Sequence, residues 1–468
     1  MVTMEKQGIP VVGIANEHFE SDWRMAARTK GVPATRYVLT PLPSNCIDVD
    51  QCEAAAVEMM DKLIDALTRP LTNAEKGPGP EELKVERNAC TGTLQEVNQY
   101  FYEREMTDGL PIIPPTEAAV IEMLTGTDLP PDHVVTRILP ELRKATVEKI
   151  AINAVMAGCL PTHMPVLIAA AETAMDLDFH LVETGVSTGS YAPLMIVNGP
   201  IRNDLSINYR HGALSPGRRA NAAIGRALRL ILLNTGRALP GIQDMGILGS
   251  PGKYTQCVGE HEEASPWEPL NVERGYAPGS SVVSIVPITA RVAILGGDNP
   301  QNTMRITAQA AVIRANSDYL GSNIVFFVSP ATCDIFRDAK WSKKDIQKHL
   351  YEHARILPTS FWGDRLYKPT GRRNTEFFLG KEMAQWISKQ EGTDMPLPIV
   401  TGPDKFIVVC VGGHGMNQNA IFTCGHGTLA SREIKLPKNW NALVAKYKPR
   451  EIERFRHTAN PRKLSTLE

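Results

Sequence analysis

Residues 406–411 read FIVVCV, an almost unbroken apolar run that is followed at once by the glycine-rich GGHGM of residues 412–416. A similar run, NIVFFV, occupies residues 323–328, and a shorter one, LMIV, occupies residues 194–197. Continuous apolar runs of this kind are typical of strands that helices cover on both faces. We therefore predict an α/β protein whose larger part is layered.

Outward from these runs, the chain divides into a small N-terminal α/β unit and a larger layered α/β domain. At 468 residues it exceeds one ordinary core, since domains average about 150 residues. The segment KGPGP at residues 76–80 is the clearest linker, because its prolines and glycines oppose a helix. We predict an α/β unit at 1–72, a linker at 73–92, a large α/β domain at 93–440, with two lobes near 93–275 and 276–440 as an open alternative, and a C-terminal tail at 441–468.

Periodicity predicts several further elements. Apolar residues recur at helical spacing over 147–155; Gly158 can end that helix and Pro161 can open the next. Residues 219–233 also predict a strong helix, and residues 282–295 predict one strand, or two that break at Pro287. In the N-terminal unit we expect strands at 11–15 and 37–39 and helices at 19–29 and 51–68.

Charge and cysteine usage exclude several classes of protein. Fifty basic and fifty-one acidic residues leave a net charge of −1, so no overall field attracts nucleic acid or anionic lipid. The eight cysteines are scattered without a Cys-x-x-Cys pair, which disfavours disulfides and structural zinc. The sequence also lacks a signal core and any run of about 18 apolar residues. We expect a cytoplasmic, oligomeric protein without nucleic-acid or membrane partners.

Cys159 is the leading candidate for a reactive group. It lies in AGCLPTH at residues 157–163, two residues before the proline that opens the predicted helix. Unpaired amides and the helix dipole at a helix start favour a thiolate and can lower the pKa of a thiol. His163, on the first turn, would serve as a base or a metal ligand. The open alternative is a small buried cysteine beside a satisfied histidine.

A second candidate cluster is GKYTQCVGEHEE at residues 252–263, which gathers a cation, a phenol, a thiol, an imidazole and carboxylates. Acid–base chemistry needs such groups in environments that separate their pKa values. We predict catalytic roles for Lys253, Cys257 and Glu260 and a substrate contact for Tyr254. A solvated charged loop is the alternative.

The glycine-rich loop after the 406–411 run is a third candidate. Gly412 and Gly413 allow the backbone to approach a ligand and its amides to face an anion, although the spacing is not that of a dinucleotide fingerprint. Ten residues on, CGHG at 424–427 would meet this loop if the intervening residues form a hairpin. Such an arrangement would suit a transition metal, zinc or iron, as a cofactor. Its predicted ligands are His261, His414, Cys424 and His426. The open alternative is an ordinary glycine-rich turn without a metal.

Two loops next to strong elements are predicted to bind substrate. Asn198 follows the 194–197 run, and SPGRRAN at residues 215–221 leads into the predicted helix. Ligand loops in α/β proteins occupy such positions. Arg219 would bind a carboxylate and Asn221 would assist it, with a structural surface as the alternative.

Four stretches carry a resemblance to a known family: DGLPIIPPT at 108–116, AVMAGC at 154–159, RANAAIGRA at 219–227 and GKY at 252–254. In these stretches, and over most of residues 10–440, the chain resembles the UGSC family of (seleno)proteins. The resemblance names no substrate, but it implies a U-G-S-C or C-G-S-C motif ahead of a segment like GIPVV at residues 8–12. That motif is absent here. Either a short companion chain carries it, which would make this chain the large subunit of a heteromer, or this branch works without it.

Three functions are compatible with these features. The first is an enzyme, or enzyme subunit, that applies thiol chemistry at Cys159 to a small, acidic molecule held by Lys253 and Arg219. The second is a metal-dependent lyase, hydratase or hydrolase. The third is a non-catalytic scaffold or regulatory subunit.

Overall fold

The computed structural model describes residues 9–20, 23–24, 27, 35–42, 49–70, 72–73, 87–313, 322–356, 381–390, 395–425 and 427–448. It contains mixed helices and strands, so the predicted α/β class is confirmed. None of the described helices combines the length and the apolar composition that crossing a bilayer requires.

The N-terminal unit contains a two-stranded parallel sheet, in which β1 (Gly13–Asn16) pairs with β2 (Tyr37–Thr40), and the long helix α3 (Val49–Thr68). Arg36, at the entry to β2, donates to the carbonyls of Ala66, Arg69 and Pro70 at the end of α3. Both strands and the helix lie where the sequence predicts them. Most of the predicted 19–29 helix lies outside the described residues.

Most of the chain after residue 93 is built on one curled sheet with the strand order β11-β8-β12-β7-β5-β6. Its centre is the long strand β7 (Val282–Leu295), which continues through Pro287 without the break that the sequence allowed. β7 pairs antiparallel with β5 (Ala192–Asn198), β12 (Gln418–Cys424) and β13 (Ala430–Glu433). β5 pairs parallel with β6 (Cys257–Gly259), and β8 (Ile324–Val328) pairs parallel with β11 (Phe406–Cys410).

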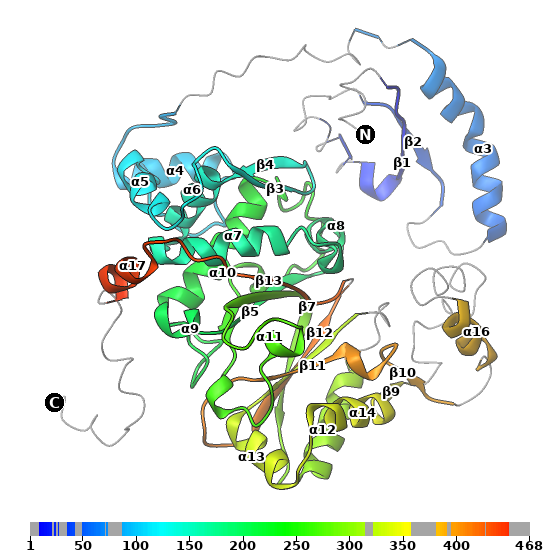
Figure 1. Cartoon of the computed structure of the whole chain (residues 1–468). Helices are drawn as coiled ribbons and strands as arrows, with labels where there is room; N and C mark the ends of the chain where they lie inside the picture. Colours follow the sequence, from blue (N-terminus) through cyan, green and yellow to red (C-terminus); the bar gives the residue numbers. More distant parts are fainter. Residues whose placement is uncertain are drawn as a thin grey trace.

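The strands carry alternate side chains to two faces, which produces three cores. Inside the curl, Leu194 and Ile196 of β5 meet Val325 and Phe327 of β8. Outside, one half of the sheet packs against the helices α6 (Val147–Ala157), α7 (Met164–Thr173) and α10 (Arg219–Asn234). The other half packs against α12 (Pro300–Ile313), α13 (Pro330–Asp338) and α14 (Lys343–His353). Figure 1 shows the two groups of helices on opposite sides of the sheet. Burial on both faces explains the unbroken apolar runs.

Local signals act as predicted between α6 and α7. Gly158 ends α6 in the left-handed conformation with φ of 86°, and Pro161 begins the short 3₁₀ turn Pro161–His163 that leads into α7.

The apolar loop 108–116 is tied to α10, because Arg226 binds Asp108 through two contacts of 2.7 and 2.8 Å.

Smaller elements complete the described chain: α4 (Leu94–Glu103), α5 (Glu117–Leu124), β3 (Val134–Ile138), β4 (Arg143–Thr146), α8 (Leu181–Val186), α9 (Ile201–Asp204), α11 (Leu270–Glu273), β9 (Arg355–Ile356), α16 (Lys381–Lys389), β10 (Leu397–Pro398) and α17 (Trp440–Tyr447).

Candidate functional site

The carboxyl ends of the two parallel strand pairs converge. The backbone N–H of His261, just after β6, donates to the carbonyl of Cys410 at the end of β11 over 2.8 Å. The two edges of the sheet therefore meet at this end. The polar residues after β5, β6 and β11, which the sequence spreads over more than 200 positions, come together here. Ligands in α/β folds bind at the carboxyl ends of parallel strands.

A segment between β5 and α10 bridges the two edges. The carbonyl of Asn208 accepts from Gly259 over 3.3 Å, and the carbonyl of Tyr209 accepts from Gly412 over 2.8 Å. Asn221 holds this segment in place, because its amide bonds the backbone of Asn208 in both directions, at 2.6 and 3.0 Å, and the carbonyl of Cys257 at 2.9 Å. Asn221 was predicted to contact substrate; its amide serves the fold.

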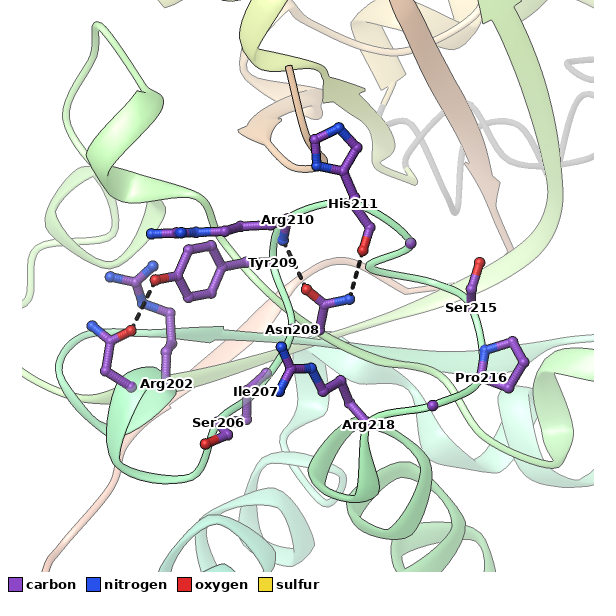
Figure 2. Close-up of a pocket in the computed structure, with 13 residues that line it drawn as sticks. Arg202, Ser206, Ile207, Asn208, Tyr209, Arg210, His211, Ser215, Pro216 and Arg218 are labelled. Atoms are coloured by element: carbon purple, nitrogen blue, oxygen red, sulfur yellow. Dashed lines mark hydrogen bonds between the residues drawn. The ribbon is translucent and has the colours of Figure 1, made fainter. Parts of the chain in front are cut away.

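Two guanidinium groups flank the ring of Tyr209. Arg202 lies 4.7 Å and Arg210 lies 5.4 Å from the ring centroid. Arg202 is buried and pairs with Glu262 at 2.8 Å and Glu263 at 3.0 Å. Arg210 is exposed and has no ion-pair partner among the described residues. Figure 2 shows the two arginines on either side of the ring. The charge of Arg202 is therefore offset, whereas that of Arg210 is available.

These residues line a pocket of about 380 Å³, here called the Arg210 pocket. Its lining includes three arginines, a histidine and two serines, and it contains no aspartate or glutamate. The lining residues are Arg202, Asn203, Ser206, Ile207, Asn208, Tyr209, Arg210, His211, Gly212, Ser215, Pro216, Gly217 and Arg218. The pocket ends where α10 begins, and no side chain caps that helix start. Arginines and free helix amides both favour an anion.

His261 stands beside the Arg210 pocket. Its ring centroid lies 5.1 Å from that of Tyr209, and its Nδ1 lies 2.9 Å from the carbonyl of Gly412. A carbonyl can only accept, so Nδ1 carries the proton and Nε2 is left as an acceptor. Burial lowers the pKa of His261, although the hydrogen bond to Gly412 opposes the shift. His261 is therefore neutral at pH 7 and can take up a proton.

The glycine-rich loop supports this site through its backbone. Gly412 adopts a φ of 109°, and a side chain on Gly413 would lie 2.1 Å from the ring of His211. Nε2 of His211 lies 2.7 Å from the carbonyl of His414. The predicted ligand-binding glycines thus allow the close approach of two loops, and Gly412 orients His261.

Behind the pocket, Asn198 and Glu260 lie side by side at the ends of β5 and β6. Both are fully buried, and the amide of Asn198 donates to the carboxyl of Glu260 over 2.6 Å. Burial raises the pKa of Glu260. Neither side chain reaches solvent, so these two predicted site residues support the site from beneath.

Cys159 and His163 lie in the helical core. Cys159 is 8% exposed, and burial raises the pKa of its thiol, with Cys257 adding to the shift and Arg226 and Arg219 opposing it. The expectation that a helix start lowers this pKa is therefore wrong, because desolvation outweighs the dipole. His163 is 1% exposed, and burial lowers its pKa to about 3, which makes it a poor base. Exposed Arg219 begins α10, one residue beyond the pocket lining.

The predicted 252–263 cluster divides between the two ends of β6. Lys253 lies before the strand and binds Asp244 at 2.5 and 2.6 Å, near Arg229. Tyr254 beside it is half exposed. Cys257 turns toward the helices, and burial raises its pKa to about 12. The strand therefore separates Lys253 from His261.

The described part of the chain does not gather the predicted metal ligands into one site, although His414 lies near enough to His261 to help lower its pKa. Cys424 is buried inside the curl, and burial raises the pKa of its thiol. His414 is exposed and lies 3.8 Å from Asp334. His426 lies outside the described residues. Within the part of the chain that the structure describes, no three histidine, cysteine, aspartate or glutamate side chains gather closely enough to hold a metal ion.

Sequence reasoning missed the central residues of the Arg210 pocket. Arg202, Tyr209, Arg210 and His211 lie between the two loops that were predicted to bind substrate, 198–200 and 215–221. The sequence signal that was available is the presence of Arg202, Arg210 and His211 in a short polar stretch between a buried strand and a helix. Such a stretch must run over a strand end.

The comparisons with known proteins concern mainly the N-terminal unit. Residues 1–69 match the model of the UGSC family. No curated protein and no solved structure matches the chain. The predicted resemblance to the UGSC family is confirmed over this segment. The Arg210 pocket and the stretches around Cys159, Arg219 and Lys253 lie outside the matched residues.

Proposed function

Starting from the UGSC family match over residues 1–69, we propose that this chain is an enzyme, or the large subunit of one, that acts on a small acidic molecule. The acid group binds in the Arg210 pocket and His261 moves a proton. The observation that carries the proposal is the pocket lining, which holds three arginines and no carboxylate.

The charge balance of the pocket supports anion binding. Arg202 is neutralised by Glu262 and Glu263, whereas Arg210 lacks an ion-pair partner among the described residues. A guanidinium presents several donors in a fixed plane, which suits a carboxylate or a phosphate. The start of α10 adds a partial positive charge at the pocket end.

The position of His261 supports proton transfer. Its Nε2 is the free acceptor of a neutral ring whose orientation is held by Gly412. A positioned neutral imidazole next to a bound acid can remove a proton from a neighbouring carbon or from water and return it later. The reaction class is therefore acid–base chemistry, as in an isomerase, lyase or hydrolase.

Calorimetry with inorganic phosphate and with malonate tests the anion site. We expect at least one of the two anions to bind. Arg210→Ala should weaken its binding about tenfold or more, because the variant loses a charge-assisted hydrogen bond to the anion. Arg104→Ala, at the exposed residue that caps the C-terminal end of α4, is the matched control and leaves affinity unchanged. No binding of either anion to the unmodified chain would overturn the proposal.

Hydrogen exchange in heavy water tests the chemistry. A panel of small carbon acids is incubated with the protein and followed by proton NMR. We expect exchange that His261→Asn abolishes while anion affinity is retained. If His261→Asn leaves an observed exchange unchanged, the role of His261 is wrong. Anion binding without exchange for any acid in the panel would instead favour the scaffold or regulatory function.

Thiol chemistry at Cys159 and metal-dependent chemistry remain alternative proposals. The effect of Cys257 on the pKa of Cys159, and the nearby cations of Arg219 and Arg226, are the observations in favour of a thiol role. Burial of both thiols weighs against it. A transition metal in stoichiometric amount in the purified protein would support the metal alternative.

A companion chain that carries the UGSC-type motif is proposed for the N-terminal unit, in a reducing, cytoplasmic compartment. Ile14 and Leu39 lie on the β1–β2 sheet with 56% and 37% of their surfaces exposed. Because Ile14 pairs with Val38 and Leu39 pairs with Ala15, the two exposed side chains lie on opposite faces of the sheet. Parallel strands are ordinarily covered on both faces, so these exposed apolar residues suit a partner. Mass spectrometry of the native complex tests the idea, and a homogeneous assembly of this chain alone would contradict it.

A further inference from the structure

Glu260 and Asn198 form an unusual pair at the ends of β6 and β5. Both side chains have no exposed surface. Oε2 of Glu260 accepts from Nδ2 of Asn198 over 2.6 Å and from the backbone N–H of Leu270 over 2.8 Å. One carboxyl oxygen is thus fully used.

The other oxygen of each group has no hydrogen-bond donor. Oε1 of Glu260 and Oδ1 of Asn198 are both buried and unpartnered among the described residues. An ionised carboxylate and an amide oxygen are both acceptors, so they cannot satisfy one another. Two buried acceptors without donors are costly to the fold.

The surrounding charges do not pair with the carboxyl of Glu260. Arg202 donates to the backbone carbonyl of Glu260, and its guanidinium forms ion pairs with Glu262 and Glu263. Lys343 of α14 exerts a longer-range attraction but binds Glu273 over 2.9 Å. Glu262, on the same loop, adds negative charge. From α13, Cys333 lies near enough to interact with Glu260 and offers no positive charge.

We propose that Glu260 is held as a neutral carboxylic acid, whose single proton on Oε1 is donated to Oδ1 of Asn198. One proton then satisfies both unpartnered oxygens, while Nδ2 of Asn198 donates in the reverse direction to Oε2. The acid and the amide form a closed, doubly hydrogen-bonded pair.

The neutral pair makes Glu260 a positioning residue for the Arg210 pocket. Nδ2 of Asn198 also contacts Glu262 at 3.0 Å, and Glu262 accepts from Gly199 at 2.7 Å and pairs with Arg202. Arg202 in turn packs on Tyr209. The pair therefore fixes Arg202 and the loop that carries His261, and it does so whether or not the proposed function is correct.

Infrared spectroscopy of the full chain tests the protonation state directly. We expect the wild-type protein at neutral pH to show the carbonyl band of a buried carboxylic acid that Glu260→Gln lacks. Glu273→Gln, which removes a nearby carboxylate paired with Lys343, is the matched control and leaves the band in place. Absence of the band from the wild type, or its persistence in Glu260→Gln, would overturn the proposal.

Substitution provides a second readout. Glutamine can donate to Asn198 and accept from Leu270 as the neutral acid does, so Glu260→Gln keeps the melting temperature within about 2 °C, whereas Glu260→Leu lowers it by about 5 °C or more. A Glu260→Gln protein as unstable as Glu260→Leu, or a cation bound in stoichiometric amount and lost on that substitution, would refute the neutral pair.

Discussion

At the scale of single residues, burial decides the chemistry of the side chains that the sequence offered as reactive. Cys159 and His163 stand at a helix start, where the dipole favours a thiolate. Their surroundings are apolar, so both groups are held in their neutral forms. Reactivity depends on desolvation, which a sequence motif does not report.

The thiol of Cys159 is expected to be slow to alkylate. Burial and a raised pKa both reduce the thiolate fraction at its position, whereas Cys52 and Cys90 are partly exposed. Under native conditions, iodoacetamide labelling followed by peptide mass spectrometry should modify Cys52 and Cys90 well before Cys159. Labelling of Cys159 at the same rate or faster would revive the thiol mechanism.

His163 is expected to make the protein sensitive to acid. Its pKa is about 3 in the folded state and 6.5 when unperturbed, so the unfolded chain binds the proton first as pH falls. The free energy of unfolding keeps its full value above pH 6.5 and falls as the pH drops from 6.5 to 3. At pH 4 the loss is roughly 3 kcal/mol.

Urea unfolding at pH 7 and pH 4 measures this effect. The loss of unfolding free energy between the two pH values should be smaller in His163→Gln than in the wild type by about that amount. His133→Gln, at an exposed position, is the control and should keep the wild-type difference. Equal losses in all three proteins would show that His163 does not titrate as described.

At the scale of elements, α10 packs so closely against the residues before β6 that position 225 requires a glycine. A methyl group on Gly225 would lie 2.5 Å from Oγ1 of Thr255 and 2.8 Å from the backbone N of Gln256. Gly225→Ala should therefore destabilise the fold by about 1–3 kcal/mol, despite a gain of about 1 kcal/mol in helix propensity.

A second helical glycine provides the comparison. At Gly185 of α8, the nearest atom to an added methyl lies 3.7 Å away, an ordinary contact. Thermal melts should show Gly185→Ala unchanged or stabilised and Gly225→Ala lowered. A Gly225→Ala protein as stable as wild type would mean that the helix moves away from the strand at little cost.

At the scale of the whole molecule, the site exists because the sheet curls. His261 and Cys410 are far apart in the chain, and their hydrogen bond closes the two edges of the sheet. That closure brings the β6 and β11 loops to the segment 202–211. The same curl places Cys424 inside and Cys159 outside, in different cores. Reactive groups that the sequence offered as candidates for one site therefore lie in different parts of the fold.

The sequence by itself determined the buried strands, the stop at Gly158 and the start at Pro161, because these depend on local periodicity and backbone chemistry. It also identified the loops around Asn198, Glu260 and Gly412. Only the tertiary structure decided that these loops meet around Arg210 and His261, while Lys253 and Cys159 lie elsewhere. The physical reason is that strand order, curl and desolvation arise from contacts between distant segments, and no local pattern encodes them.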